Sequence, residues 1–149
     1  MTEKKFSAPG RTELAGNHTD HNNGKVLAAA IQLEITATVQ KTNDNIVVFR
    51  STGFPDVTVN LTNLDIDPKE TGTTEALVRG IAAEFVKRGR AIGGFAANAV
   101  SGVLPGSGLS SSAALETLLC RIFEFLYNDG SLSHIEIAQI GQAAENLYF

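Results

Sequence analysis

The sequence predicts an α+β fold, built as one domain over residues 1–149. The chain has 149 residues, of which 43% are hydrophobic and 19% are charged, so it has enough apolar surface to bury a core. The periodicity of its apolar residues gives the order strands, helix, strand, helix, helix, and not the regular strand–helix alternation of a parallel sheet. No internal repeat, low-complexity linker or sharp change of composition divides the chain.

Charge and cysteine content exclude several classes of protein. Twelve Lys and Arg against sixteen Asp and Glu give a net charge of −4, which argues against a general nucleic-acid binder because phosphate neutralisation needs clustered basic side chains. The single cysteine, Cys120, excludes an internal disulfide and a cysteine-rich zinc site. No apolar run approaches the roughly 20 residues of a membrane span, and the polar N-terminus lacks a signal core, so we expect a cytoplasmic protein.

The first half of the chain predicts strands after a polar beginning. Residues 6–24 show no clear period, so we expect a loose or functional segment there. Residues 31–40 alternate apolar and polar side chains, many of them β-branched, and this pattern predicts a half-buried strand. Two further strands are predicted at 46–49 and around 57–61, with turn-forming residues between them. These three strands together indicate an antiparallel meander.

A polar loop over 62–72 is followed by a predicted helix. Thr73 or Thr74 can cap its start, and Gly89 provides a stop signal. Small and apolar residues over 95–103 predict a further strand.

Two more helices are predicted after a break rich in glycine. One runs from about Ser111 to Tyr127, with apolar residues at helical spacing. The other begins at a capping box formed by Ser133 and Glu136, and it is still running near Phe149.

A glycine- and serine-rich segment, residues 105–114, lies between the predicted strand and the next helix. Glycines let a backbone turn tightly and approach a ligand, and a helix start offers unpaired N–H groups and a positive dipole end. The hydroxyls of Ser110, Ser111 and Ser112 add donors, or a ligand for a metal on phosphates. The segment therefore suits a polyphosphate, while a helix start capped by one of the serines is the structural alternative.

Two familiar phosphate motifs fit this segment poorly. A Walker A loop needs a lysine followed by Ser or Thr after its second glycine, and no lysine follows Gly108 there. The dinucleotide fingerprint expects a third glycine, where this chain has Ser111, and a strand after the helix, where this chain predicts another helix. A dinucleotide-dependent oxidoreductase is therefore disfavoured.

A second polar segment, residues 9–24, combines a guanidinium, carboxylates, imidazoles and amides. This mixture suits a sugar, because each sugar hydroxyl both donates and accepts. Asp20 can accept from two hydroxyls, and Arg11 can steady a negative charge. His18, Asp20 and His21 also have the types of metal ligands, but their spacing matches no common zinc signature. Loop histidines bonded to nearby backbone are the structural alternative.

Three segments in order resemble the galactokinase branch of the GHMP small-molecule kinases. They are GRTELAGNHTDHNNGKVL at 10–27, LPGSGLSSSAALE at 104–116 and GQAAENLYF at 141–149. The resemblance implies the N-terminal domain of these kinases, a ribosomal protein S5 domain 2-like α+β fold with helices covering one face of a sheet. It also implies ATP-dependent phosphorylation of galactose at its anomeric hydroxyl, giving galactose 1-phosphate, with Mg²⁺ on the nucleotide.

The resemblance carries roles to particular residues of this chain. Arg11 matches the catalytic arginine beside the reacting hydroxyl. Ser112 and Glu145 match the pair that holds Mg²⁺. Sugar-binding positions are matched by Asn17, His18 and Asp20. The nucleotide phosphate loop is matched by Gly106, Ser107, Gly108, Leu109, Ser110, Ser111 and Ser112.

Three departures from the family pattern leave the substrate open. Asn17 stands where the family usually has a sugar-binding glutamate, and an amide offers two donors and one acceptor group in its place. His21 replaces a tyrosine and Glu13 replaces an asparagine. A kinase for a related hexose or amino sugar is therefore an alternative. A non-catalytic sugar and ATP sensor is another, because the matched residues serve binding.

In the family, a catalytic aspartate and a C-terminal domain would follow the segment matched at 141–149. We therefore expect an N-terminal portion that lacks turnover alone. Its uncovered apolar faces would pair with the C-terminal domain or promote self-association. The string ENLYF at 145–149 is also most of a protease-tag site, but the preceding GQAA fits the family and favours the native interpretation.

Overall fold

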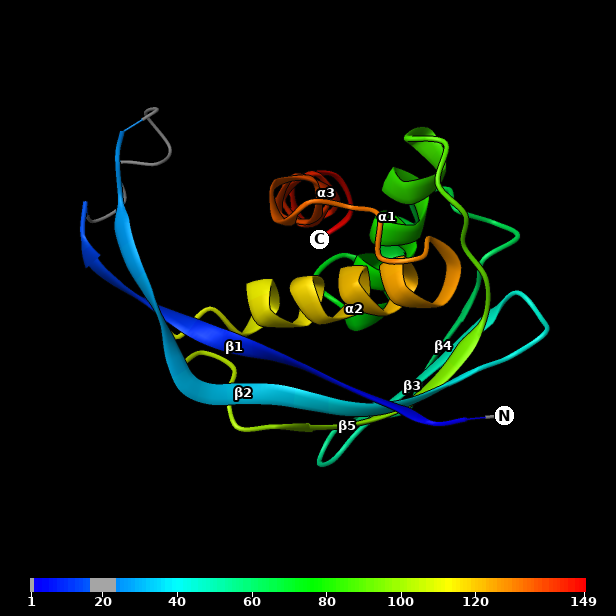
Figure 1. Cartoon of the computed structure of the whole chain (residues 1–149), viewed down its shortest axis with the longest axis horizontal. Helices are drawn as coiled ribbons and strands as arrows, with labels where there is room; N and C mark the ends of the chain where they lie inside the picture. Colours follow the sequence, from blue (N-terminus) through cyan, green and yellow to red (C-terminus); the bar gives the residue numbers. More distant parts are fainter. Residues whose placement is uncertain (1, 17–23) are drawn as a thin grey trace.

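The computed structural model describes residues 2–16 and 24–149. Figure 1 shows a mixed sheet with the α-helices gathered over one of its faces, as the sequence analysis predicts. The described elements, in chain order, are β1 (Lys4–Ala15), β2 (Leu27–Lys41), β3 (Ile46–Ser51), β4 (Val57–Asn60), the short 3₁₀ helix η2 (Pro68–Glu70), α1 (Thr74–Lys87), β5 (Phe95–Ser101), α2 (Ser111–Tyr127) and α3 (His134–Tyr148).

The strand order β1-β2-β5-β3-β4 corrects the predicted meander. β5 lies between β2 and β3, antiparallel to β2 and parallel to β3. A parallel neighbour requires a long crossover, and the segment containing β4 and α1 supplies it. Alternation within each strand shows which residues face a core, but it does not show which strands are neighbours. Only the β3–β4 pair of the meander is confirmed.

Residues 6–24 were expected to be loose or functional, and the loose alternative is wrong for residues 6–15, which lie in β1. β1 pairs antiparallel with β2 from Lys4 opposite Val39 to Ala15 opposite Leu27. β1 is an edge strand with a largely polar surface, so its sequence lacks the alternation that would have shown it. Figure 1 shows the distal part of the β1–β2 hairpin standing away from the helices.

The helix signals of the sequence are confirmed. Thr73 caps α1, where its hydroxyl accepts from the N–H of Ala76 at 3.4 Å. Ser133 and Glu136 form both hydrogen bonds of the predicted capping box at the start of α3. Within the described residues, none of the helices has the length and apolar character to cross a membrane.

Aromatic rings hold the helical layer on the sheet. The ring of Phe123, from α2, lies 5.6 Å from the ring of Phe85 in α1 and 5.4 Å from that of Phe95 in β5, measured between centroids. All three side chains are fully buried. The core therefore joins β5, α1 and α2, and it leaves the start of α2 at the edge of the core beside β1.

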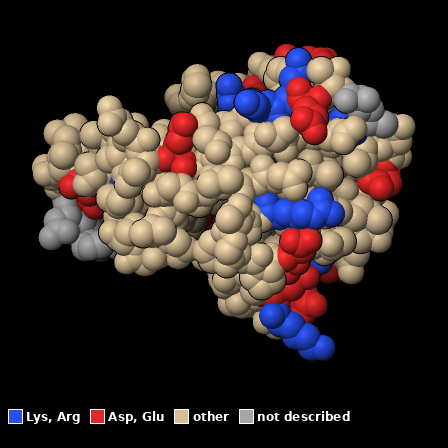
Figure 2. Space-filling view, turned by 90° about the horizontal axis from the view of Figure 1, so that it is seen from below, with Lys and Arg blue, Asp and Glu red and all other residues tan. Residues whose placement is uncertain are grey.

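The outer face of the sheet, seen in Figure 2, carries interspersed basic and acidic side chains on one half. The other half, which leads to the end of the β1–β2 hairpin, is mostly uncharged in this view.

Candidate active site

The loop before α2 is bent by three residues with left-handed backbone conformation. Gly106 has a φ of 72°, Gly108 of 74° and Ser110 of 58°. A side chain strains this conformation, so glycine is favoured at the first two positions. A Cβ added to either glycine would meet nothing within 4 Å. The glycines are therefore required by the turn of the chain and not by a lack of space.

The N-terminus of α2 has no side-chain cap. Ser110 is the N-cap residue, but its side chain makes no capping hydrogen bond, and no acidic residue lies in the first turn. The alternative that one of the serines caps this helix is therefore wrong. The N–H groups of a first turn have no partner within the helix, and they carry the positive end of its dipole. This geometry suits an anion.

Arg11 joins the first motif to this loop. Its backbone N–H donates to the carbonyl of Leu109 at 3.1 Å, and its Nε donates to the hydroxyl of Ser110 at 3.1 Å. The neighbouring Gly10 allows this approach, because a Cβ there would lie 2.8 Å from the Leu109 carbonyl oxygen. Residues about one hundred positions apart in sequence therefore meet at one end of α2.

Ser112 and Glu145 lie on facing helices beside that end. The hydroxyl of Ser112, in the first turn of α2, donates to Oε1 of Glu145 in α3 at 3.3 Å. A hydroxyl and a carboxylate are hard oxygen ligands of the kind that Mg²⁺ prefers, so this pair fits a magnesium ion. Residue pattern alone would have left Glu145 as an ordinary helix carboxylate, and only the family resemblance singled it out.

Glu116 is a residue of this site that the sequence analysis missed. It lies one helical turn beyond Ser112, only 5% of its surface is exposed, and its Oε1 has no hydrogen-bond partner among the described residues. Burial, and to a lesser extent the charge of Glu145, raise its pKa to about 7 against the opposing effect of Arg11. The signal in the sequence was its helical spacing from Leu119 and Cys120, which places a carboxylate on the buried face.

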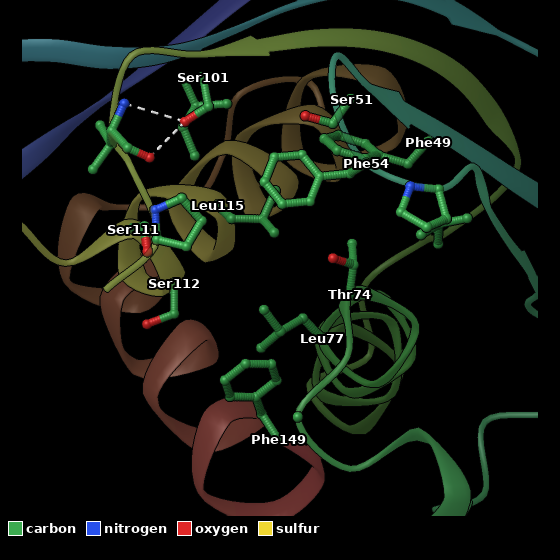
Figure 3. Close-up of a pocket in the computed structure, with 16 residues that line it drawn as sticks. Phe49, Ser51, Phe54, Thr74, Leu77, Ser101, Ser111, Ser112, Leu115 and Phe149 are labelled. Carbon is green, nitrogen blue, oxygen red and sulfur yellow. Dashed lines mark hydrogen bonds between the residues drawn. The ribbon is translucent and has the colours of Figure 1, made fainter. Parts of the chain in front are cut away.

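A mostly apolar cavity of about 210 Å³ opens beside the first turn of α2. Figure 3 shows Ser111 and Ser112 at one side of this space, and Phe54 and Leu77 on other sides. The cavity is therefore adjacent to the proposed phosphate loop and separate from the β1–β2 hairpin end.

The predicted sugar-binding residues lie outside the described part of the chain. These are Asn17, His18 and Asp20, together with His21 of the zinc alternative. Their roles therefore remain predictions. In the described ranges, 2–16 and 24–149, no cluster of three or more His, Cys, Asp or Glu side chains is arranged to hold a metal ion.

Two family models together match all three motif segments. The model for the N-terminal domain of GHMP kinases matches residues 76–149, and the model for the galactokinase galactose-binding signature matches residues 2–41. The fold and the site thus define a domain of the small-molecule kinases, and the chain belongs to the GHMP kinase family. The curated relatives described next are galactokinases.

Galactokinases of several bacteria are similar along nearly the whole chain. The enzyme of Clostridium tetani is 36% identical over 145 residues, which are 96% of this chain and 36% of that protein. The Lacticaseibacillus casei enzyme is 36% identical over 150 residues, 99% of this chain and 38% of that protein. The chain thus spans just over a third of the length of the curated relatives it matches.

Solved structures agree in fold. The structure of Lactococcus lactis galactokinase complexed with galactose matches with a TM-score of 0.89 and 31% identity, over 98% of this chain and 38% of that chain. The mevalonate kinase of Methanococcus jannaschii matches with a TM-score of 0.79 at 22% identity, over 97% of this chain and 46% of that chain, and this match supports the fold alone.

Proposed function

We propose that this chain supplies the sugar- and nucleotide-binding parts of a galactokinase, which transfers the γ-phosphoryl group of ATP to the anomeric hydroxyl of galactose. The observation that carries the proposal is the pair of hydrogen bonds between Arg11 and the loop at Leu109 and Ser110. They bring the strand of the galactose-binding signature against the start of α2, where a phosphate would lie.

The phosphates would bind at the uncapped start of α2. The first-turn N–H groups lie at this end, Ser111 and Ser112 belong to the same turn, and the left-handed glycines Gly106 and Gly108 shape the loop around it. Phosphoryl transfer needs positioning and charge stabilisation more than covalent chemistry. Arg11 is placed to offset negative charge that develops on the reacting oxygen atoms. Asn17, His18 and Asp20 would hold the sugar.

The cavity beside α2 would take the nucleotide base. Its walls are mostly apolar, and it adjoins Ser111 and Ser112. The ring of Phe54 is 53% exposed, so a flat heterocycle can stack on it without displacing core packing. ATP would then span from this cavity to the loop in front of Arg11.

Ser112 and Glu145 would hold a magnesium ion on the phosphates. Their two oxygen atoms already lie 3.3 Å apart, and Mg²⁺ commonly takes one or two protein oxygens together with phosphates and water. When bound, the ion would supply charge neutralisation at the β- and γ-phosphates.

None of the residues proposed here takes the proton of the sugar hydroxyl, so the 149 residues alone are expected to bind without turnover. We infer a cytoplasmic location, since ATP is supplied there.

A panel of hexoses and amino sugars tests the proposal. The complete gene product containing this chain would be assayed for ADP release with each sugar, together with Ser112→Ala and the control Ser131→Ala. Ser131 is an exposed residue in the loop after α2, where its hydroxyl accepts from Arg90 at 3.2 Å. We expect the fastest turnover with galactose, a large loss for Ser112→Ala and none for the control.

Other outcomes of the panel distinguish the alternatives. Faster turnover with another sugar would make that sugar the preferred substrate, and it would support the hypothesis that Asn17 changes the sugar specificity. Binding of ATP and galactose without any turnover by the complete product would contradict the kinase proposal and favour the sensor.

A further inference from the structure

Glu116 differs from the other buried carboxylates of the described chain. Glu84 and Glu124 are equally buried, but each has cationic partners. Glu124 accepts from Arg121 at 2.7 Å and from the N–H of Leu132 at 3.3 Å. Oε1 of Glu116 has no partner in the described residues. A buried carboxylate oxygen without a hydrogen bond lowers the stability of the fold, so we look for a ligand that donates a hydrogen bond to this oxygen.

The position of Glu116 places such a ligand near the Ser112–Glu145 pair. The carboxylate lies between α2 and α3, and a Cβ added to Gly141 would come within 3.2 Å of its Oε2. Glu116 is one turn beyond Ser112 on α2, and Gly141 is one turn before Glu145 on α3. The Glu116 carboxylate thus lies one helical turn away from the Ser112–Glu145 pair, between the same two helices.

The charges around Glu116 point to the same end of the site. Glu145 and Arg11 are the charged groups that act on its carboxyl. Of these two groups, Arg11 is the only cation, and it already donates its Nε to Ser110. An additional cation beside the Ser112–Glu145 pair would balance this excess of negative charge.

We propose that Glu116 is a positioning residue of the magnesium site, and that its free oxygen accepts a hydrogen bond from a water molecule in the hydration shell of the ion. The inference rests on the proposed function of Ser112 and Glu145. Mg²⁺ gives up its water reluctantly and usually keeps several molecules when bound to protein. A buried carboxylate one turn behind the ligand pair can orient one of them and fix the ion against α2.

Nucleotide binding at varied magnesium concentration tests this role without requiring turnover. The full chain and its Glu116→Gln variant would be titrated with a non-hydrolysable ATP analogue by calorimetry, over a series of MgCl₂ concentrations. Outer partners of a metal site contribute about 10- to 100-fold to metal affinity. We therefore expect Glu116→Gln to raise the MgCl₂ concentration for half-maximal nucleotide binding about tenfold.

Two further variants separate positioning from a structural role. Glu124→Gln removes a buried but paired carboxylate of the same helix, and it is expected to lower thermal stability without changing the magnesium requirement. Gly141→Ala keeps Glu116 but crowds its carboxylate, because the new Cβ would lie 3.2 Å from Oε2. It is expected to shift the magnesium requirement in the same direction as Glu116→Gln.

The outcomes are distinguishable. If the wild-type chain binds the analogue with magnesium, and Glu116→Gln and Gly141→Ala bind it with the same magnesium requirement, the positioning role is wrong and the proposed function stands. An equal shift in Glu124→Gln would also overturn the positioning role. If the wild-type chain does not bind the analogue at any magnesium concentration, both the inference and the proposed function fail.

Discussion

Replacing Glu116 by glutamine should change how the stability of the chain depends on pH. Burial, and to a lesser extent the charge of Glu145, raise the pKa of this carboxyl from an ordinary 4.5 to about 7 against the opposing effect of Arg11. Because the folded state holds the proton more tightly than the unfolded state, stability is greatest below about pH 4.5 and falls as the pH rises through about 7. At about 1.4 kcal/mol per pKa unit, the ionised carboxyl destabilises the fold by up to about 3 kcal/mol.

Glutamine has nearly the same shape and does not titrate, so the variant escapes this penalty. Urea unfolding of both proteins at pH 5 and pH 8 gives the measurement. Relative to the wild type, the free energy of unfolding of the variant should increase by about 2.5 kcal/mol from pH 5 to pH 8, because a small part of the effect is already present at pH 5. A stability difference that is the same at both pH values would refute the reasoning. Glu124→Gln provides the control, and it should be less stable than wild type at both pH values because it loses contacts with Arg121 and Leu132.

Three other substitutions test separate parts of the site. Arg11→Lys loses the Nε hydrogen bond to Ser110, and we expect turnover of the complete product to fall about 100-fold while thermal stability stays unchanged; unchanged turnover would contradict its role. Gly108→Ala forces a side chain into left-handed backbone without a clash, so urea unfolding should show a loss of about 1–2 kcal/mol and calorimetry weaker nucleotide binding. Phe54→Ala should weaken nucleotide binding about tenfold with little change in melting temperature, whereas Phe125→Ala, another half-exposed ring, should leave binding unchanged.

Local sequence signals were sufficient for the helices of this protein. The capping residues Thr73 and Ser133 begin α1 and α3 where the sequence placed them, and the apolar spacing over 111–127 matches α2. These signals act within one or two turns of the chain. They require no knowledge of what the helix packs against.

The edge strand and the order of the sheet were beyond such signals. β1 is held by its pairing with β2, the next strand along the chain, and by the contact of Arg11 with the loop at Leu109, about one hundred positions away. The insertion of β5 between β2 and β3 likewise depends on the crossover through α1. Both features arise from hydrogen bonds between distant segments, which leave no period in either one.

The candidate site shows the same contrast between local sequence signals and tertiary contacts. The sequence by itself determined the chemistry on offer, namely the glycines and serines of the 106–112 loop, the guanidinium of Arg11 and the polar residues Asn17, His18 and Asp20. Only the tertiary structure brought Ser112 to Glu145 and placed Glu116 behind them, unpaired and buried. The physical reason is that the pairing and desolvation of a carboxylate depend on the helix packed against it, and the residues flanking that carboxylate in the sequence do not reveal that helix.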